Sequence, residues 1–165
     1  MKEQQQRQIF DSLYAQYHAM VLQLCMGFMK GDQALAQDLL QEIFINTWNA
    51  LSGYRGDASY KTWIYRITVN TCLQYIRKEK ARPGISVTDM DKQVKEEATV
   101  FKDDYGQLYQ AIGQLGEVDR LIIMMVLDEM EYDEICKIVG ISEVNLRVKI
   151  HRIKQRLKKI MSYEY

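Results

Sequence analysis

The chain has 165 residues, 47% of them hydrophobic, which is enough to bury one ordinary core or two small ones. Its 22 basic and 22 acidic residues balance, and no apolar run approaches the roughly 20 residues that a membrane-spanning helix needs. The opening segment MKEQQQRQIF contains no apolar signal region, so we expect a cytoplasmic protein without an integral membrane segment.

Three cysteines are spread along the chain, each among apolar neighbours: Cys25, Cys72 and Cys136. None belongs to a CxxC pair or to a Cys/His cluster with the spacing of metal ligands. We therefore expect reduced core thiols and no disulfide, metal ion or cofactor.

Apolar residues recur at helical spacing through most of the chain, and sustained period-2 alternation, the pattern of strands, is nearly absent. In chain order, this periodicity predicts helices over residues 6–30, 33–51 and 59–80. Further helices are expected over residues 104–116 and 118–127, followed by two that meet at the segment VGIS. The expected fold class is therefore all-α.

The only proline, Pro83, is followed by a polar stretch, ISVTDMDKQVKEEAT, whose composition is typical of a flexible linker. We expect two small helical domains, over residues 5–81 and 104–162, joined by a linker over residues 82–103. The alternative is an irregular part of a single domain.

The segment DLLQEIFINTWNAL divides into two faces on a helical projection. The inward face is apolar and contains Leu40, Ile43, Phe44, Thr47 and Leu51. The outward face combines acidic, amide and apolar side chains, namely Asp38, Gln41, Glu42, Ile45 and Asn49. This mixture is unsuited to DNA and better suited to a protein partner, although a plain solvated face is the alternative.

The helix after Ser59 gathers rings, amides and cations on one side. That side carries Trp63, Ile67, Asn70, Gln74 and Arg77, with Arg66 at its margin. The preceding loop, YRGDAS, adds Tyr54, Arg55, Asp57 and Ser59. Amides read base edges, aromatic rings stack on unpaired bases and cations hold the backbone, so we predict contact with single-stranded nucleic acid. The loop could hold a base pulled from its stack; for Trp63 alone, core packing is the alternative.

The balanced net charge hides an asymmetry in the last third of the chain. Residues 106–141 contain two basic and seven acidic residues, whereas residues 142–165 contain seven basic and two acidic ones. Local patches of this kind set the field that a polyanion meets. The acidic segment can also cover the basic helix when the protein is free.

Residues 131–160 have the pattern of a helix-turn-helix. Ile135, Ile138 and Val139 form a buried stripe, Gly140 can adopt the left-handed conformation that ends a helix, and Ser142 is a good N-cap. In the second helix, one apolar seam is formed by Leu146, Ile150, Ile153, Leu157 and Ile160.

The rest of this second helix is almost purely cationic. Opposite the seam lie Arg147, Val148, His151, Arg152, Gln155, Lys158 and Lys159, and flanking it are Lys149, Lys154 and Arg156. Such a helix fits the major groove of B-DNA, where Arg can bond guanine and Lys can neutralise phosphates. A solvated basic helix is the alternative, but such helices usually interleave Glu with Lys.

Three motifs in this order resemble bacterial sigma factors of the extracytoplasmic-function (ECF) group, within the sigma-70 family. DLLQEIFINTW is similar to the helix that binds core polymerase, and YRGDASYKTWIYRITVNTCLQYIRK to the segment that melts and reads the −10 element. DRLIIMMVLDEMEYDEICKIVGISEVNLRVKIHRIKQRLKK is similar to the −35-reading domain. The resemblance implies a sigma-2 domain over residues 5–81 and a sigma-4 domain over residues 104–162.

The resemblance also implies roles for the three surfaces. Contacts with the clamp helices of the largest polymerase subunit would involve Asp38, Gln41, Glu42, Ile45 and Asn49, with Trp48 nearby. The −10 contacts would involve Tyr54, Arg55, Asp57, Ser59, Trp63, Arg66, Asn70, Gln74 and Arg77. The −35 contacts would involve Arg147, Val148, Lys149, His151, Arg152 and Arg156. Val148 stands where a small polar residue is frequent, so its base contact would be apolar, for example with a thymine methyl.

We therefore expect a dissociable initiation subunit without an active site of its own, not an enzyme. It would bind core RNA polymerase, read the −35 duplex and trap the melted non-template strand of the −10 element. The family also implies an anti-sigma protein as a regulator. Two alternatives are a stand-alone helix-turn-helix regulator, usually a symmetric dimer, and a helical adaptor or inhibitor with no DNA role.

Overall fold

The computed structural model describes residues 2–82 and 104–162, which contain helices and no strand. The all-α prediction is confirmed, and the predicted linker lies outside these residues apart from Arg82. The helices in chain order are α1 (Glu3–Phe28), α2 (Gln33–Ala50), the short 3-10 helix η1 (Leu51–Gly53), α3 (Tyr60–Ala81), α5 (Asp104–Gly113), α6 (Glu117–Leu127), α7 (Tyr132–Val139) and α8 (Glu143–Ser162). None of the helices described is long and apolar enough to cross a bilayer.

Local capping chemistry sets several of these boundaries. The Asp32 carboxylate accepts a hydrogen bond from the backbone N–H of Leu35 at 3.0 Å, which caps α2. Ser59 caps α3 in the same way, because its hydroxyl accepts from the N–H of Thr62 at 3.2 Å. Gly140 ends α7 with φ +79°, the left-handed conformation that its sequence context predicted.

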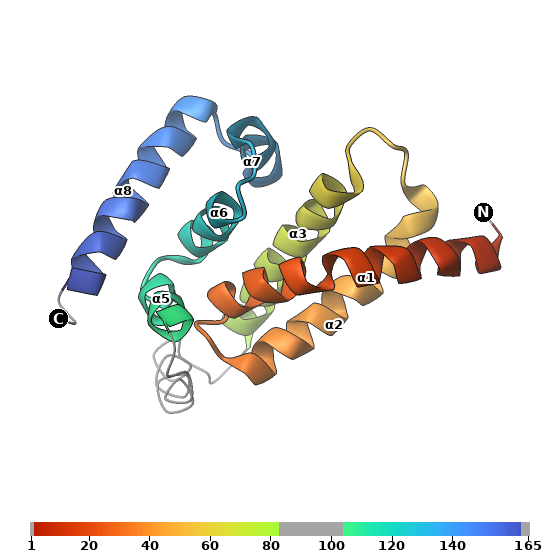
Figure 1. The fold of residues 1–165 in the computed structure, drawn as a ribbon, viewed down its shortest axis with the longest axis horizontal. Helices are drawn as coiled ribbons and strands as arrows, with labels where there is room; N and C mark the ends of the chain where they lie inside the picture. The colour runs from red at the N-terminus through yellow and green to blue at the C-terminus, as the bar shows by residue number, and fades with distance from the viewer. Residues whose placement is uncertain (1, 83–103, 163–165) are drawn as a thin grey trace.

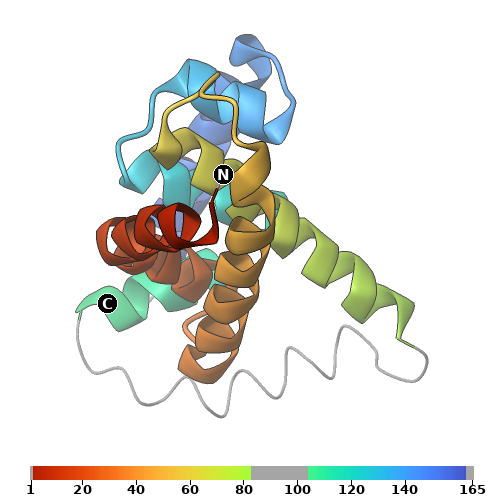
Figure 2. The ribbon, with the colours of Figure 1, turned by 90° about the vertical axis from the view of Figure 1, so that its right-hand side faces the viewer.

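The N-terminal helices pack against one another along apolar faces. α1 contacts both α2 and α3, and α2 contacts α3. Figure 2 shows these three helices together, with the blue C-terminal helices above them. Aromatic rings join α1 to α2, because Phe10 lies edge-on to Phe44 and Trp48 with centroids 6.1 and 5.4 Å apart.

The C-terminal helices pack directly on the N-terminal group, and both groups contribute to one continuous apolar core. α1 contacts α5 and α6, α3 contacts α7, and α8 packs on α5, α6 and α7 (Figure 1). The approach of α1 to α6 is close: a Cβ added at Gly27 would lie 2.3 Å from Sδ of Met124. A side chain at position 27 would therefore have to displace the Met124 side chain.

A buried arginine joins the two groups where α1 meets α6. The Arg120 guanidinium donates through Nε to the backbone oxygen of Phe28 at 3.1 Å and through Nη1 to that of Leu115 at 2.7 Å. Its central carbon also lies 5.3 Å from the centroid of the Phe28 ring. The Phe28 carbonyl lies at the C-terminal end of α1, where no helical N–H reaches it, and the Leu115 carbonyl lies in the connection between α5 and α6. Arg120 therefore gives a hydrogen-bond donor to two buried backbone acceptors that lie outside regular helical pairing.

Polar contacts continue this junction along α3. The buried Tyr65 hydroxyl donates to the carboxylate of Asp128, which also lies 3.4 Å from Nζ of Lys61. Thr62 donates to Oε2 of Glu134 at 2.8 Å. Burial, followed by the hydrogen bond and charge of Asp128, raises the pKa of Tyr65 well above its ordinary value. The acidic α6–α7 segment therefore docks on the N-terminal half of α3.

The cysteines occupy two kinds of environment. Cys25 and Cys72 are fully buried, and burial raises the pKa of the Cys25 thiol to about 12. The pKa of the Cys72 thiol is also raised, first by burial and then by the charge of Cys25. Cys136 is only half-buried, so the expectation of a core thiol does not hold fully there. Among the described residues, no group of His, Cys, Asp and Glu has the arrangement of a metal site.

Replacing Arg120 with Met keeps an unbranched apolar stem but removes every donor. We expect Arg120→Met to lower the free energy of unfolding by about 2–4 kcal/mol, because two buried carbonyls lose their partner. Chemical denaturation followed by circular dichroism measures this change. Arg7→Met, on the exposed face of α1, is the matched control and should change stability by less than about 0.5 kcal/mol. Equal effects of the two substitutions would contradict the assigned role of Arg120.

Candidate functional surfaces

The outward face of α2 lies as the sequence predicts, and we call it the α2 surface: Asp38, Gln41, Glu42, Ile45 and Asn49. Ile45 is 60% exposed, so this face carries a large apolar side chain that is open to solvent in the middle of the helix. Glu42 is half-buried, with Oε1 3.9 Å from Nζ of Lys78 on α3. The other three side chains are exposed. The surface therefore offers one apolar side chain within a polar and acidic ring.

Trp48, predicted to lie near this surface, takes part in the aromatic contact between α1 and α2. Its ring is half-buried against Phe10, and its backbone oxygen accepts a hydrogen bond from Gln6 at 3.1 Å. Tyr14 extends this contact outward: it is 42% exposed, 4.8 Å from the Phe44 ring and stacked on His18 at 5.1 Å. Tyr14 is not among the residues predicted from the sequence, although Phe10, Tyr14 and His18 follow one another at four-residue spacing on α1.

Three rings meet at the start of α3, and we call Tyr54, Tyr60 and Trp63 the ring cluster. Tyr54 stacks on Tyr60 with centroids 4.4 Å apart and planes 22° from parallel. Trp63 is tilted against Tyr54 at 5.0 Å and lies edge-on to Tyr60 at 6.2 Å. All three rings are half-buried, so Trp63 is neither a core residue nor a free platform. Tyr60 is not among the predicted residues either, yet it lies directly at the helix start between the predicted loop and Trp63.

The loop before α3 is held by the tyrosine at its beginning. The Tyr54 hydroxyl donates to the backbone oxygen of Ala58, closing the loop on itself. Gly56 has φ +78°, a conformation that side chains rarely adopt. Three predicted loop residues, Arg55, Asp57 and Ser59, are exposed. Ser59 is also the cap of α3, so it has a structural role in addition to any contact with a ligand.

The remaining predicted residues of α3 form one outward stripe. Asn70, Gln74 and Arg77 are exposed, and Arg66 is half-buried at the margin. The stripe starts at the ring cluster and lies away from Tyr65, through which α3 meets the C-terminal helices. Packing between the two helical groups therefore leaves this stripe accessible.

The seam of α8 is buried as predicted. Leu146, Ile150, Ile153 and Leu157 are in the core, and Ile160 is half-buried. Ser142 caps the helix by accepting from the N–H of Asn145 at 3.2 Å, as its position in the sequence predicted. On the opposite face, Val148, His151 and Arg152 are exposed, and none of them has a hydrogen bond or ion pair with another described residue.

The other three cations predicted for this surface have partners within the protein. Nζ of Lys149 lies 3.2 Å from the Asp119 carboxylate, so the acidic segment does contact the basic helix at this point. Arg156 donates to the backbone oxygen of Gln114 at 3.0 Å. These contacts direct both side chains toward α5 and α6.

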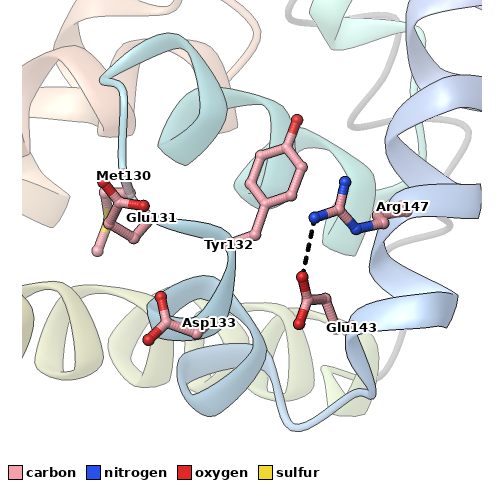
Figure 3. A pocket seen from close by; sticks show the side chains of 6 residues that line it. All are labelled: Met130, Glu131, Tyr132, Asp133, Glu143 and Arg147. Carbon is pink, nitrogen blue, oxygen red and sulfur yellow. Dashed lines mark hydrogen bonds and ion pairs between the residues drawn. The ribbon is translucent and has the colours of Figure 1, made fainter.

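Arg147 lines a surface pocket of about 430 Å³ between α7 and α8 (Figure 3). Its guanidinium bonds the Glu143 carboxylate at 2.9 Å and lies 5.2 Å from the centroid of the Tyr132 ring. The pair is exposed, so the ion pair by itself contributes little stability. Its consequence is geometric: the guanidinium is directed along the side of the helix and not straight outward.

The closure of the loop by Tyr54 can be tested without any ligand. We expect Tyr54→Phe to raise the rate of tryptic cleavage after the exposed Arg55 about fivefold, because one hydrogen bond is worth about 1 kcal/mol of local opening. The matched control is Tyr60→Phe, which removes a hydroxyl for which no partner is present among the described residues. Equal cleavage rates in the two variants would mean that the hydroxyl of Tyr54 does not hold the loop.

Family models for sigma-70 region 2 and sigma-70 region 4 match residues 13–82 and 105–157 of this chain. The RNA polymerase sigma-H factor of Pseudomonas aeruginosa is 28% identical, over 94% of this chain and 87% of that protein. The ECF RNA polymerase sigma-E factor of Escherichia coli K12 is 29% identical, over 90% of this chain and 84% of that protein.

The fold matches as well. The sigma factor RpoE of Bartonella quintana, solved in complex with the anti-sigma factor NepR, superposes with a TM-score of 0.74 at 17% identity, covering 94% of this chain and 98% of that one. The two region matches fall on the two helical groups, in the order that the motifs predicted. The chain belongs to the sigma-70 family of RNA polymerase sigma factors, in the extracytoplasmic-function group.

Proposed function

We propose that this protein is an ECF initiation subunit that brings core RNA polymerase to promoters with −35 and −10 elements and stabilises the melted −10 region. The observation that carries the proposal is the presence of three exposed surfaces of different chemistry on α2, α3 and α8, within the two regions that match the sigma-70 family. The protein would act in the cytoplasm, where the polymerase works. The bond-forming chemistry would belong to the polymerase and not to this chain.

The α2 surface is the proposed contact with the clamp helices of the largest polymerase subunit. Its exposed Ile45 can fill an apolar pocket on the partner, and such central anchors carry most of the binding energy in protein interfaces. Asp38 and Glu42 add acidic groups at its edge, which would favour a basic partner surface. Among the three surfaces, this one is the least suited to nucleic acid.

The ring cluster and the outward stripe of α3 are the proposed site for the melted non-template strand of the −10 element. Half-buried rings offer faces and edges on which unpaired bases can stack, and stacking accepts any base. Asn70 and Gln74 add amides that can distinguish base edges, while Arg66 and Arg77 can hold the backbone. Since a paired base cannot reach this site, binding here would favour the open state of the promoter.

The exposed face of α8 is the proposed reader of the −35 duplex. Arg152 and His151 have no competing partner in the described structure, so both are available to DNA. One well-formed base contact supplies about 1–3 kcal/mol of discrimination. A few such contacts select a promoter only when the polymerase adds its own affinity for DNA, which is why we expect the free protein to bind promoters weakly.

The packing of the C-terminal helices on α1 and α3 is, in this proposal, a closed form of the protein. The solved Bartonella sigma factor that it resembles was captured with an anti-sigma factor. We propose that an anti-sigma protein regulates this chain too, by holding the two helical groups in a fixed arrangement. Promoter binding would instead require the α3 and α8 surfaces to reach two separated DNA elements.

Run-off transcription tests the proposal. Core polymerase is mixed with this protein on genomic fragments, and transcript ends are mapped by sequencing. We expect new start sites that share −35 and −10 elements, and we expect Arg152→Ala to lower their use about 10- to 100-fold by loss of one charged contact with DNA. Arg7→Ala serves as the control for a lost surface cation. Absence of new start sites, or an equally strong footprint of the protein alone on a palindrome, would favour the stand-alone regulator.

A second test addresses the α2 surface. We expect Ile45→Lys to weaken binding to core polymerase at least about tenfold, because the substitution replaces the apolar centre of the contact with a charge. Gln33→Lys adds the same charge at the exposed start of α2 and should leave the affinity unchanged. Titration of labelled protein with core polymerase measures the dissociation constants of both variants. If both variants bind like the unmodified protein, the polymerase contact lies elsewhere.

A further inference from the structure

The face of α8 directly opposite its buried seam is apolar near the start of the helix. Val144 is 73% exposed and Val148 is 44% exposed. The two residues lie four positions apart, so their side chains are neighbours on one face, roughly 6 Å apart along the axis. At the same end of the helix, Leu146 and Ile150 of the seam point into the core. Single exposed valines are common, but two on the face that a recognition helix presents to DNA need an explanation.

The cations around these valines are not equivalent. Arg147 is drawn to the side by Glu143 and Tyr132, and Lys149 is held by Asp119 on the other side. The first two turns of the helix therefore present an apolar pair at their centre, with charges directed along both flanks. Such flanking charges suit phosphates, which lie on either side of the major groove, better than they suit base edges.

The major groove contains one apolar group that can meet such a pair, the C5-methyl group of thymine. The two valines are roughly 6 Å apart along the axis, while successive bases of one strand are about 3.4 Å apart. One helix face can thus reach thymines in base pairs that are adjacent or next but one. Water would otherwise cover both valines, so their burial against methyl groups is favourable wherever thymines occupy these positions.

We propose that Val144 and Val148 are specificity-determining residues that read thymine methyl groups in two nearby base pairs of the −35 element. This inference rests on the proposed function, because it requires that α8 read the −35 duplex. It assigns a role in base recognition to Val144. The valine pair would contact bases at the centre of the helix face, with Arg152 and His151 beside it. Arg147 becomes a residue of the rim that positions the helix on the backbone.

The experiment replaces thymine with deoxyuridine, which removes only the methyl group and keeps base pairing. The DNA is a linear fragment of a promoter mapped by transcript ends with this protein and core polymerase. Each −35 thymine, on either strand, is replaced in turn, and run-off transcription is measured. We expect two positions at which the replacement lowers promoter use about fourfold, the effect of one buried methyl-sized group.

The valines are tested on the same fragments. Val144→Ala and Val148→Ala should each lower use of the thymine promoter and remove the effect of deoxyuridine at one position, so that the loss of the methyl and the loss of the valine are not additive. Val118→Ala is the control, because Val118 is also exposed, at 39%, but lies on α6. This variant should respond to deoxyuridine as the unmodified protein does.

The outcomes separate the two proposals. Transcription that depends on Arg152 but is indifferent to every deoxyuridine replacement overturns the methyl inference alone. The methyl inference is also overturned if the double alanine variant still discriminates thymine from deoxyuridine, or if the mapped −35 elements lack A·T pairs at two nearby positions. Absence of any promoter-directed initiation overturns the proposed function and this inference with it.

Discussion

The constraint on which this structure depends is that one apolar core is built from helices of both halves of the chain. Each helix gives one face to this core, and only the faces left over can bind a partner. The seam of α8 through Leu146 and Ile153 therefore fixes Val148 and Arg152 outward, and the burial of Tyr65 on α3 fixes Asn70 outward. The three proposed surfaces are therefore the helix faces that do not pack into the core. Their chemistry differs because the exposed residues are free of the demands of packing.

Helical periodicity was sufficient to predict the fold class and the inward or outward position of most side chains. The four- and three-residue spacing of α8, for example, defines its buried seam without reference to any other segment. Helix caps were predicted equally well, because Ser142 and Gly140 make their capping contacts within one turn of their own position. The face of the helix on which a side chain lies, and its role as a cap, can be inferred from the sequence because helix geometry is regular.

Contacts between distant segments could not be predicted in this way. Arg120 meets the carbonyl of Phe28 across 92 positions of the chain, and no periodic pattern connects them. The same holds for the ion pair between Lys149 and Asp119, which lie 30 positions apart in the chain. The apolar pattern of a helix predicts which side chains are buried and which are exposed. A cation on the flank of a helix, in contrast, can point either to solvent or to a neighbouring helix. The partners of charged residues are therefore the part of a candidate site that depends most on tertiary structure.

The glycine at the meeting of α1 and α6 has a consequence for the evolution of such proteins. With no side chain at Gly27, the backbone of α1 contacts Met124 directly, so the identity of one residue in the first half is coupled to that of another in the second. A chimera that joins the region-2 half of this chain to the region-4 half of a homologue with another residue at position 124 would change this contact. A bulkier or branched side chain there would press on the backbone of α1 at Gly27, so the exchanged halves would close less readily.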